Sequence, residues 1–598
     1  MEHADRSGVD AFHAMVPMRD GTRLNTFVFL PKSRGPRWPV IVHRTPYGIT
    51  ASDARDKTDC TSAWLPSAEE PFRGSILRGW RNIVARGYVA VYQDTRGRHG
   101  SEGEDRVYSD DAADGYDTLE WIAAQPWTNQ MVGISGSSAG ATTTFAAAST
   151  RHPSLRAFFA QAGASSIYDD VVYEGQSIEM ERLWLWVARN IPGLSRSHRE
   201  TIMRRSGIAA AALDEAAASA AARYTRLDAA RRADGPFINS PDWMRLPLTR
   251  YPDFATWQPF LDEIITHPTP DAFRARHNFR RTIDIPGFHV TTWYDIFQTS
   301  VLAAFNDIQA RTGTQKLWIG PNEHSFVYAS NFWPRDPYFE WFDYWLKGVQ
   351  SGIMDKPPVY CSPRAWIEDR AAYVPADWHY IERWPPPGTS PYRLYLRGDG
   401  GLTDHGPGGA PRSYDYDPRR PIPTLGGRNM LIDAGPRDQR PAQSLPNYGL
   451  IYCSQALRDD LTIAGAVRVT LHVQSSCPDT DFVAKLIEVM PDGRAMLLMD
   501  GVTRAMCRDP SSEPRHLVPG RVEQLAVDLG HICHTIHAGD RIEVDVTSSN
   551  FPRRARNTNS GNLVLANDCE ADLRVATNTV HHADETPSFI ELPVLTRR

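Results

Sequence analysis

The chain has 598 residues, too many for one hydrophobic core, so two or three domains are expected. Its net charge of −6 argues against a surface that binds nucleic acid. No apolar stretch reaches membrane-spanning length, and the first residues lack the basic and apolar regions of a secretory signal. The 7 cysteines form no C-x-x-C pair, which is typical of reduced thiols but leaves one or two disulfides open. We therefore expect a cytoplasmic protein with neither a nucleic-acid nor a membrane partner.

Short apolar strands alternate with helical patterns over residues 11–175. The runs 38–43 and 88–92 are typical of buried strands, and residues 114–124 of an amphipathic helix. Such alternation predicts a mostly parallel α/β sheet. Between two of these elements, residues 94–97 are expected to form a tight turn with a buried ion pair.

A G-x-S-x-G pentapeptide at residues 136–140 is the most informative motif of the chain. The apolar run 131–134 precedes it, and the Ala-rich, helix-compatible run 141–149 follows. In a nucleophile elbow the serine occupies a strained turn between strand and helix, where side chains at Gly136 and Gly140 would collide with the flanking elements. The pattern thus predicts Ser138 as a nucleophile. A Gly- and Ser-rich turn without a catalytic role is the alternative.

The pattern becomes mainly helical over residues 168–280. Residues 174–189 and 208–232 are helix candidates, and strand signals return at 286–293 and 315–319. A helical block inserted into one sheet is typical of a cap that walls a substrate cleft. We therefore expect a hydrolase core made of residues 1–167 and 281–358, with a cap over residues 168–280.

Two residues follow the returning strands in the order that a serine hydrolase requires. Asp295 ends the apolar run 288–294, and His324 ends the run 317–323. In α/β-hydrolase sheets the chain order is serine, acid, histidine, with each group on a loop after a strand. We expect Asp295 to orient His324, and His324 to take the proton of Ser138. A helix N-cap at Asp295 and an ordinary loop histidine are the alternatives.

The C-terminal part, residues 359–598, has a different pattern. Residues 384–387 and 397–410 are rich in Pro and Gly and are typical of linkers and turns. Period-two runs follow at 467–473, 481–489 and 541–546. Many short strands separated by turns predict an all-β sandwich of the jelly-roll kind.

Taken together, these motifs resemble the family of cocaine esterases, X-prolyl dipeptidyl-peptidases and α-amino-acid ester hydrolases. The resemblance runs almost end to end. In the hydrolase part it rests on residues 44–47, 93–97, 101–103, 114–118, 125–127, 132–138, 293–295, 320–324 and 342–348. In the C-terminal part it rests on residues 479–482, 549–553 and 587–593.

The resemblance implies a catalytic triad of Ser138, Asp295 and His324. It also implies an oxyanion hole formed by the Tyr47 hydroxyl and the Ala139 backbone N–H, two donors aimed at the developing alkoxide. Without the resemblance, Tyr47 would be interpreted as a tyrosine packed at a strand end.

Two departures from the family pattern affect the site. Ala139 and Gly140 make a smaller elbow, since the family usually carries an aromatic residue after the nucleophile. Asn322 stands where the family favours Trp after Gly-Pro. Both changes replace aromatic bulk by space, so the substrate preference of any one member should not be transferred.

Aromatic residues are candidates for an apolar acyl pocket. Phe297 lies two residues after the acid, and Trp184 and Trp186 lie in the cap, where a role in the cap core is the alternative. Peptidase-like and amino-ester members need carboxylates for a substrate ammonium, and Glu174, Glu179 and Glu181 occupy the right region. Acidic residues on a helix are usually solvated, however. We therefore favour an esterase or acylase for a neutral or aromatic acyl group over a dipeptidyl peptidase.

Other classes of function have weaker support. The spacing of His531, His534 and His537 suggests a metal site, but in a β-strand these three side chains do not share one face, so no metal is expected. A carbohydrate-binding module and an inactive scaffold are further alternatives. The expected partner is a small-molecule ester or amide, with no cofactor. The sequence leaves a homo-oligomer open.

Overall fold

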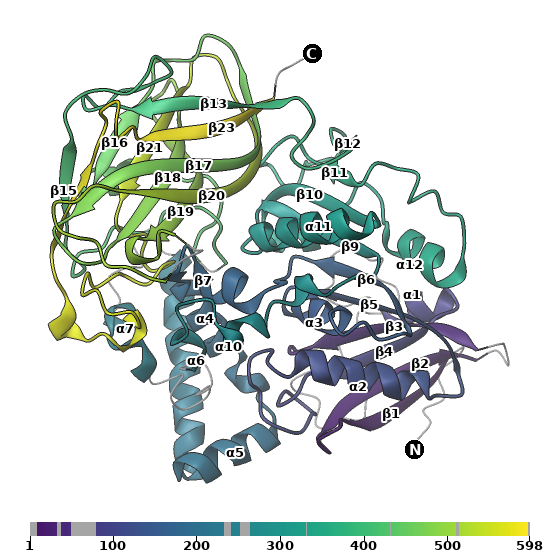
Figure 1. Ribbon diagram of the computed structural model, residues 1–598. Helices are drawn as coiled ribbons and strands as arrows, with labels where there is room; N and C mark the ends of the chain where they lie inside the picture. The colour runs from purple at the N-terminus through teal and green to yellow at the C-terminus, as the bar shows by residue number, and fades with distance from the viewer. Residues whose placement is uncertain are drawn as a thin grey trace.

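The computed structural model describes residues 9–32, 37–49, 79–232, 241–251, 263–329, 332–430, 432–509 and 513–595. A large, mostly parallel sheet flanked by helices lies beside a β domain, and a group of helices fills the angle between them (Figure 1). None of the described helices combines the length and apolar character that a membrane crossing needs.

The hydrolase domain is built on one ten-stranded sheet. Its strands lie in the order β1 (Val9–Pro17), β2 (Arg23–Pro31), β4 (Val89–Asp94), β3 (Trp38–Thr45), β5 (Thr128–Ser137), β6 (Leu155–Gln161), β9 (Gly287–Tyr294), β10 (Gln315–Glu323), β11 (Val359–Cys361) and β12 (His379–Ile381). Neighbouring strands from β4 to β11 are parallel, and the pairings of β1, β2 and β12 are antiparallel. The expected parallel α/β sheet is therefore present.

Helices cover both faces of this sheet. Helices α2 (Asp111–Ala123), α3 (Ala139–Ala148) and α11 (Gln298–Thr312) contribute to the hydrophobic cluster on one face. Helices α1 (Trp80–Ala85) and α12 (Tyr338–Lys347) contribute to the cluster on the other. Along β3, Val40 and Val42 face the first cluster and Ile41 the second. Burial on both faces explains why these strands are continuous apolar runs.

The sheet continues beyond the expected end of the hydrolase core at residue 358. β11 pairs with β10 over residues 359–361, and β12 pairs with β11 over residues 379–381. The expected boundary is therefore wrong by two strands. Each of them is only three residues long, too short for a periodic pattern, and proline-rich linker appears only after them.

The cap begins with a helical turn at Tyr168–Val172, as expected, but the helix candidate at 174–189 begins later than predicted. Residues 173–178 form a hairpin, β7 (Tyr173–Glu174) and β8 (Ser177–Ile178), before α4 (Met180–Asn190). Gly175 has φ +55°, and a Cβ there would lie 1.7 Å from the carbonyl oxygen of Val502, so glycine is required. The Ala-rich run forms the long helix α6 (Ala210–Arg232), as expected. Among the described residues of the cap, shorter helices are α5 (Arg196–Ser206), α7 (Pro241–Met244) and α10 (Ala272–Ala275).

The C-terminal domain consists of two antiparallel sheets. The larger has the order β14 (Leu402–Thr403), β13 (Thr389–Leu396), β23 (Phe589–Leu595), β17 (Leu461–Ser475), β22 (Ala576–Val580) and β15 (Arg412–Tyr416), with β20 (Glu523–Ile536) also on β17. The smaller has the order β16 (Leu450–Cys453), β21 (Arg541–Thr547), β18 (Asp481–Val489) and β19 (Ala495–Arg504). One short helix, α13 (Arg440–Gln443), precedes β16. All three predicted period-two runs lie in these strands.

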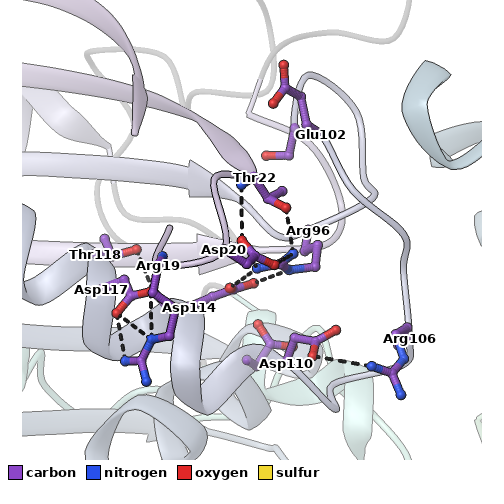
Figure 2. A network of polar contacts seen from close by, with 12 residues as sticks. Arg19, Asp20, Thr22, Arg96, Glu102, Arg106, Asp110, Asp114, Asp117 and Thr118 are labelled. Atoms are coloured by element: carbon purple, nitrogen blue, oxygen red, sulfur yellow. Dashed lines mark hydrogen bonds and ion pairs between the residues drawn. The ribbon is translucent and has the colours of Figure 1, made fainter. Parts of the chain in front are cut away.

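A network of ion pairs holds the turn after β4 to α2 (Figure 2). The Arg96 guanidinium donates to Asp114 at 2.6 Å and to Asp20 at 2.6 Å. Asp114 is buried, whereas the side chain of Asp20 is 51% exposed. Backbone bonds from Arg98 N–H to Thr95 O and from Gly97 N–H to Glu102 O close the turn. The expectation of a tight turn with an ion pair is confirmed.

Candidate active site

Ser138 stands at the junction of β5 and α3, in strained backbone. It has φ 53° and ψ −125°, which non-glycine residues rarely adopt. A Cβ at Gly136 would lie 2.1 Å from the carbonyl oxygen of Gly140, so the elbow cannot close around a larger residue. At Gly140 a Cβ would lie 3.2 Å from the carbonyl oxygen of Arg44. The local geometry is the predicted nucleophile elbow.

His324 and Asp295 meet Ser138 from the ends of two other strands. His324 Nε2 lies 3.1 Å from Ser138 Oγ, and His324 Nδ1 lies 2.7 Å from Asp295 Oδ1. Asp295 is fully buried and also accepts hydrogen bonds from the hydroxyl of Thr291 and the backbone N–H of Phe297. An imidazole held between a hydroxyl and a buried carboxylate can accept a proton from one and be oriented by the other.

Two further predicted groups lie at the nucleophile. The Tyr47 hydroxyl is 3.3 Å from Ser138 Oγ and accepts a hydrogen bond of 3.4 Å from Trp186 Nε1. Ala139 is the first residue of α3, where backbone N–H groups have no partner within the helix. Both groups can therefore donate to an oxygen that develops charge beside Ser138.

The three predicted pocket residues separate in space. Phe297 packs edge-to-face on the imidazole of His324, with 5.7 Å between ring centroids, and Trp186 reaches Tyr47. Trp184 is instead only 2% exposed and packs on Tyr251 within the cap. Its assignment to the pocket is wrong, because side chains two positions apart on a helix point in different directions.

The three cap glutamates contact other groups of the protein, although the side chain of Glu174 is still 26% exposed. Glu174 pairs with Arg428, Arg553 and Arg554 of the C-terminal domain. Glu179 pairs with Arg554 and Arg182, and Glu181 accepts a hydrogen bond from the backbone N–H of Ile432. Three guanidinium groups hold the pKa of Glu174 well below its usual range, in spite of burial. These carboxylates join the cap to the β domain, which corrects both interpretations of their sequence pattern.

Both neighbouring domains hold the loop after β9, which carries Asp295. Arg182 of α4 donates to the carbonyl oxygen of Ile296 at 2.9 Å. Gln298 donates to the carbonyl oxygen of His531 at 2.5 Å and accepts from Arg428 at 3.2 Å. The position of the acid therefore depends on contacts from the cap and from the C-terminal domain.

Two tyrosines near Ser138 were missed by the sequence analysis. Tyr108, with φ 66°, places its ring 6.0 Å from that of Trp186. Tyr328 packs edge-to-face on His324 with 6.0 Å between the rings. Tyr108 lies in irregular chain and has no signal in the sequence. Tyr328 lies four residues after His324, and a helical turn following the histidine would have placed it there; that turn is the 3-10 segment His324–Tyr328.

Asn322 and the histidine triplet of the β domain have structural contacts. Asn322 is buried with φ 69°, and its side-chain amide exchanges two hydrogen bonds with the backbone of Ile367, so it does not open the pocket. His531 accepts from Trp384 Nε1, His534 pairs with Glu488, and His537 pairs with Asp460. Within the described ranges no three His, Cys, Asp or Glu side chains gather as a metal site would need.

A serine elbow on a parallel sheet, facing a histidine and a buried carboxylate after later strands, defines the α/β-hydrolase class. The comparisons agree. The profile of the X-Pro dipeptidyl-peptidase (S15) family matches residues 20–326, and that of the X-Pro dipeptidyl-peptidase C-terminal non-catalytic domain matches residues 345–591. The chain therefore belongs to this family and is a hydrolase with a C-terminal non-catalytic domain.

Individual relatives cover the whole length. The chain is 30% identical to the cocaine esterase of Rhodococcus sp. (strain MB1 Bresler), over 98% of this chain and 99% of that one. An α-amino acid ester hydrolase has the same fold, with 22% identity, a TM-score of 0.72, and 99% and 98% of the two chains covered. An aminopeptidase from a Thaumarchaeota archaeon also has it, with 22% identity, a TM-score of 0.71, and 98% and 97% covered.

Proposed function

We propose that the chain is a serine hydrolase that cleaves a carboxylic ester of a small aromatic or apolar acyl group through an acyl-enzyme. The observation that carries this proposal is the chain of contacts from Ser138 Oγ through His324 to the buried Asp295. The similarity to a cocaine esterase over nearly the whole length supports the ester as the bond that is cleaved.

Acylation begins when Ser138 Oγ attacks the substrate carbonyl carbon while His324 Nε2 takes the hydroxyl proton. Asp295 stabilises the resulting imidazolium and fixes its tautomer. The carbonyl oxygen becomes an alkoxide, to which the Tyr47 hydroxyl and the Ala139 N–H donate. His324 then protonates the departing alcohol oxygen, the bond from carbon to that oxygen breaks, and an ester of Ser138 remains.

Deacylation reverses the sequence with water. His324 takes a proton from water, the hydroxide oxygen attacks the acyl carbon, and the same two donors hold the new alkoxide. His324 returns the proton to Ser138 Oγ as the carboxylic acid leaves. Every proton has a carrier among the residues of the chain, so the cycle needs no cofactor.

A neutral acyl group is favoured by the surroundings of Ser138. Phe297 and Trp186 provide aromatic surface there, with Tyr108 behind Trp186. Glu174, Glu179 and Glu181, the carboxylates that could have held a substrate ammonium, are occupied by arginines and backbone of the cap and the C-terminal domain. We infer that a free amino group on the substrate gains little here. We also propose that the two C-terminal sheets form a jelly roll.

The test compares acyl-matched nitrophenyl esters with Xaa-Pro nitroanilides, each with wild-type protein and Ser138→Ala. We expect ester hydrolysis that is lost in Ser138→Ala, with much slower anilide cleavage. Faster cleavage of the Xaa-Pro anilides would overturn the substrate class and favour the dipeptidyl-peptidase alternative. Ester hydrolysis that survives in Ser138→Ala would overturn the nucleophile.

A further inference from the structure

The hydroxyl of Tyr328 is a buried polar group beside the nucleophile that the mechanism above does not use. Among the residues that the structure describes, its oxygen makes no hydrogen bond of ordinary geometry, although it is screened from solvent. Buried hydroxyls are nearly always paired, because leaving one unpaired costs free energy of folding. Such a group at an active site is suited to a ligand.

The ring of Tyr328 packs on the imidazole of His324 with 6.0 Å between centroids, which places the phenol beside the reacting atoms. Burial raises the pKa of Tyr328 well above its usual value. The charges of Tyr47 and Asp295 raise this pKa further, and a hydrogen bond with Ser138 lowers it. The hydroxyl therefore stays protonated throughout the range in which a histidine can act as a base, and it is available as a donor.

Tyr47 and Tyr328 are held near Ser138 by different parts of the protein. Tyr47 comes from the loop after β3 and contacts Trp186 of the cap. Tyr328 ends the 3-10 turn that begins with His324 and packs on the imidazole ring. In serine hydrolases the departing oxygen lies next to the histidine that protonates it. The Tyr328 ring therefore lies against the group that protonates the departing oxygen, whereas Tyr47 contacts the cap.

We propose that the Tyr328 hydroxyl donates a hydrogen bond to the leaving-group oxygen of the ester at Ser138. This inference rests on the proposed ester hydrolysis. As the bond from carbon to oxygen breaks, negative charge develops on the departing oxygen; Tyr328 stabilises that charge while the proton itself comes from His324 Nε2. The phenol keeps its own proton, so no further acid or base is required. The benefit should be largest for alcohols that are poor leaving groups.

The experiment uses two esters with one acyl group, an alkyl ester and a nitrophenyl ester, with full-length wild type and Tyr328→Phe. We expect kcat/KM of the alkyl ester to fall about 10- to 100-fold in Tyr328→Phe, and that of the nitrophenyl ester less than about 3-fold. Tyr47→Phe should lower both by a similar factor. Tyr168→Phe is the matched control, since the Tyr168 hydroxyl is also buried without a partner among the described residues, but lies in the cap.

An equal loss on both esters in Tyr328→Phe, or no loss on either, would overturn the proposal. A second test compares Tyr328→Gln with Tyr328→Met. Both variants lack the aromatic ring, and the two new side chains are of similar size. The alkyl-ester rate should be higher for Gln, which carries a donor; equal rates would contradict the proposal. If wild type cleaves neither ester, the proposed function fails and the role of Tyr328 fails with it. If wild-type cleavage depends on Ser138, the proposed function stands. The role of Tyr328 is then decided by the loss of kcat/KM on the alkyl ester relative to the nitrophenyl ester.

Discussion

The hydrolase sheet and the C-terminal β domain each bury a carboxylate, and the partners of these carboxylates differ. Asp295 is fully buried against His324, which can gain and lose a proton. Asp500 is 2% exposed and lies 2.6 Å from Arg553, which stays charged. The first pair can move a proton and the second can only hold a structure together. We therefore propose that the nature of the partner separates residues that set the rate from residues that set stability.

Replacing each of the two acids, Asp295 and Asp500, by asparagine is expected to have the largest effect. In Asp295→Asn the amide can hold the wrong tautomer of His324, and we expect kcat for the ester to fall about 10³- to 10⁴-fold. The melting temperature should stay close to that of wild type. The matched control is Asp500→Asn, which should lower the melting temperature and leave kcat of the folded protein within about 3-fold. The opposite pattern would contradict the separation of roles.

Removing the arginine of the structural pair is the next largest change. Arg553 lies between Asp500 and Glu174 at the interface of cap and β domain, so Arg553→Met leaves Asp500 without its guanidinium and Glu174 with two of its three. We expect the free energy of unfolding, measured by urea titration, to fall by about 3–5 kcal/mol. Arg393→Met, which removes an exposed pair with Glu591, serves as the control with little change. Equal effects of the two variants would show that burial does not decide the outcome.

A buried histidine of the sheet makes the free energy of unfolding depend on pH. Burial lowers the pKa of His289 from 6.5 to about 4. Between these values the unfolded chain binds a proton that the folded chain does not, so stability falls as the pH drops from 6.5 to 4. The loss from His289 alone is about 3 kcal/mol. Urea titrations at several pH values should show that the free energy of unfolding falls less steeply in His289→Gln than in wild type. In His405→Gln, whose side chain is 89% exposed, the fall should equal that of wild type.

The exposed end of the network around Arg96, at Asp20, gives the smallest expected effect. The hydrogen bond from Arg96 lowers the pKa of Asp20 from 3.8 to about 2. This contribution to stability is complete above pH 3.8 and is lost as the pH falls through 2. Because the Asp20 side chain is 51% exposed, Asp20→Asn should cost less than about 1 kcal/mol at pH 7. A loss as large as that of Arg553→Met would contradict the role given to burial.

The sequence predicted those parts of the site that follow strands. Ser138, Asp295 and His324 each end an apolar run, and parallel strands bring such ends to one edge of the sheet. Three strands of the β domain, β17, β18 and β21, were found from their period of two. Trp184 was misassigned because the pattern of a helix gives its apolar stripe but not which neighbour covers it.

The contacts between domains could not be predicted in the same way. Glu174 pairs with Arg428 and Arg553, which are hundreds of residues away along the chain, and no local pattern marks such a pair. The short strand β11 was missed because three residues carry no periodicity. Tyr328 was missed because the 3-10 turn that places it four residues after His324 is too short to be predicted from a pattern.

The central claim is that Ser138 forms a covalent acyl intermediate with the help of His324. The most direct measurement is intact-protein mass spectrometry, with peptide mapping, after treatment with a fluorophosphonate that reacts with activated serines. We expect one adduct, on Ser138, which is absent in Ser138→Ala and forms far more slowly in His324→Ala. An adduct at another residue, or none while ester hydrolysis persists, would contradict the account.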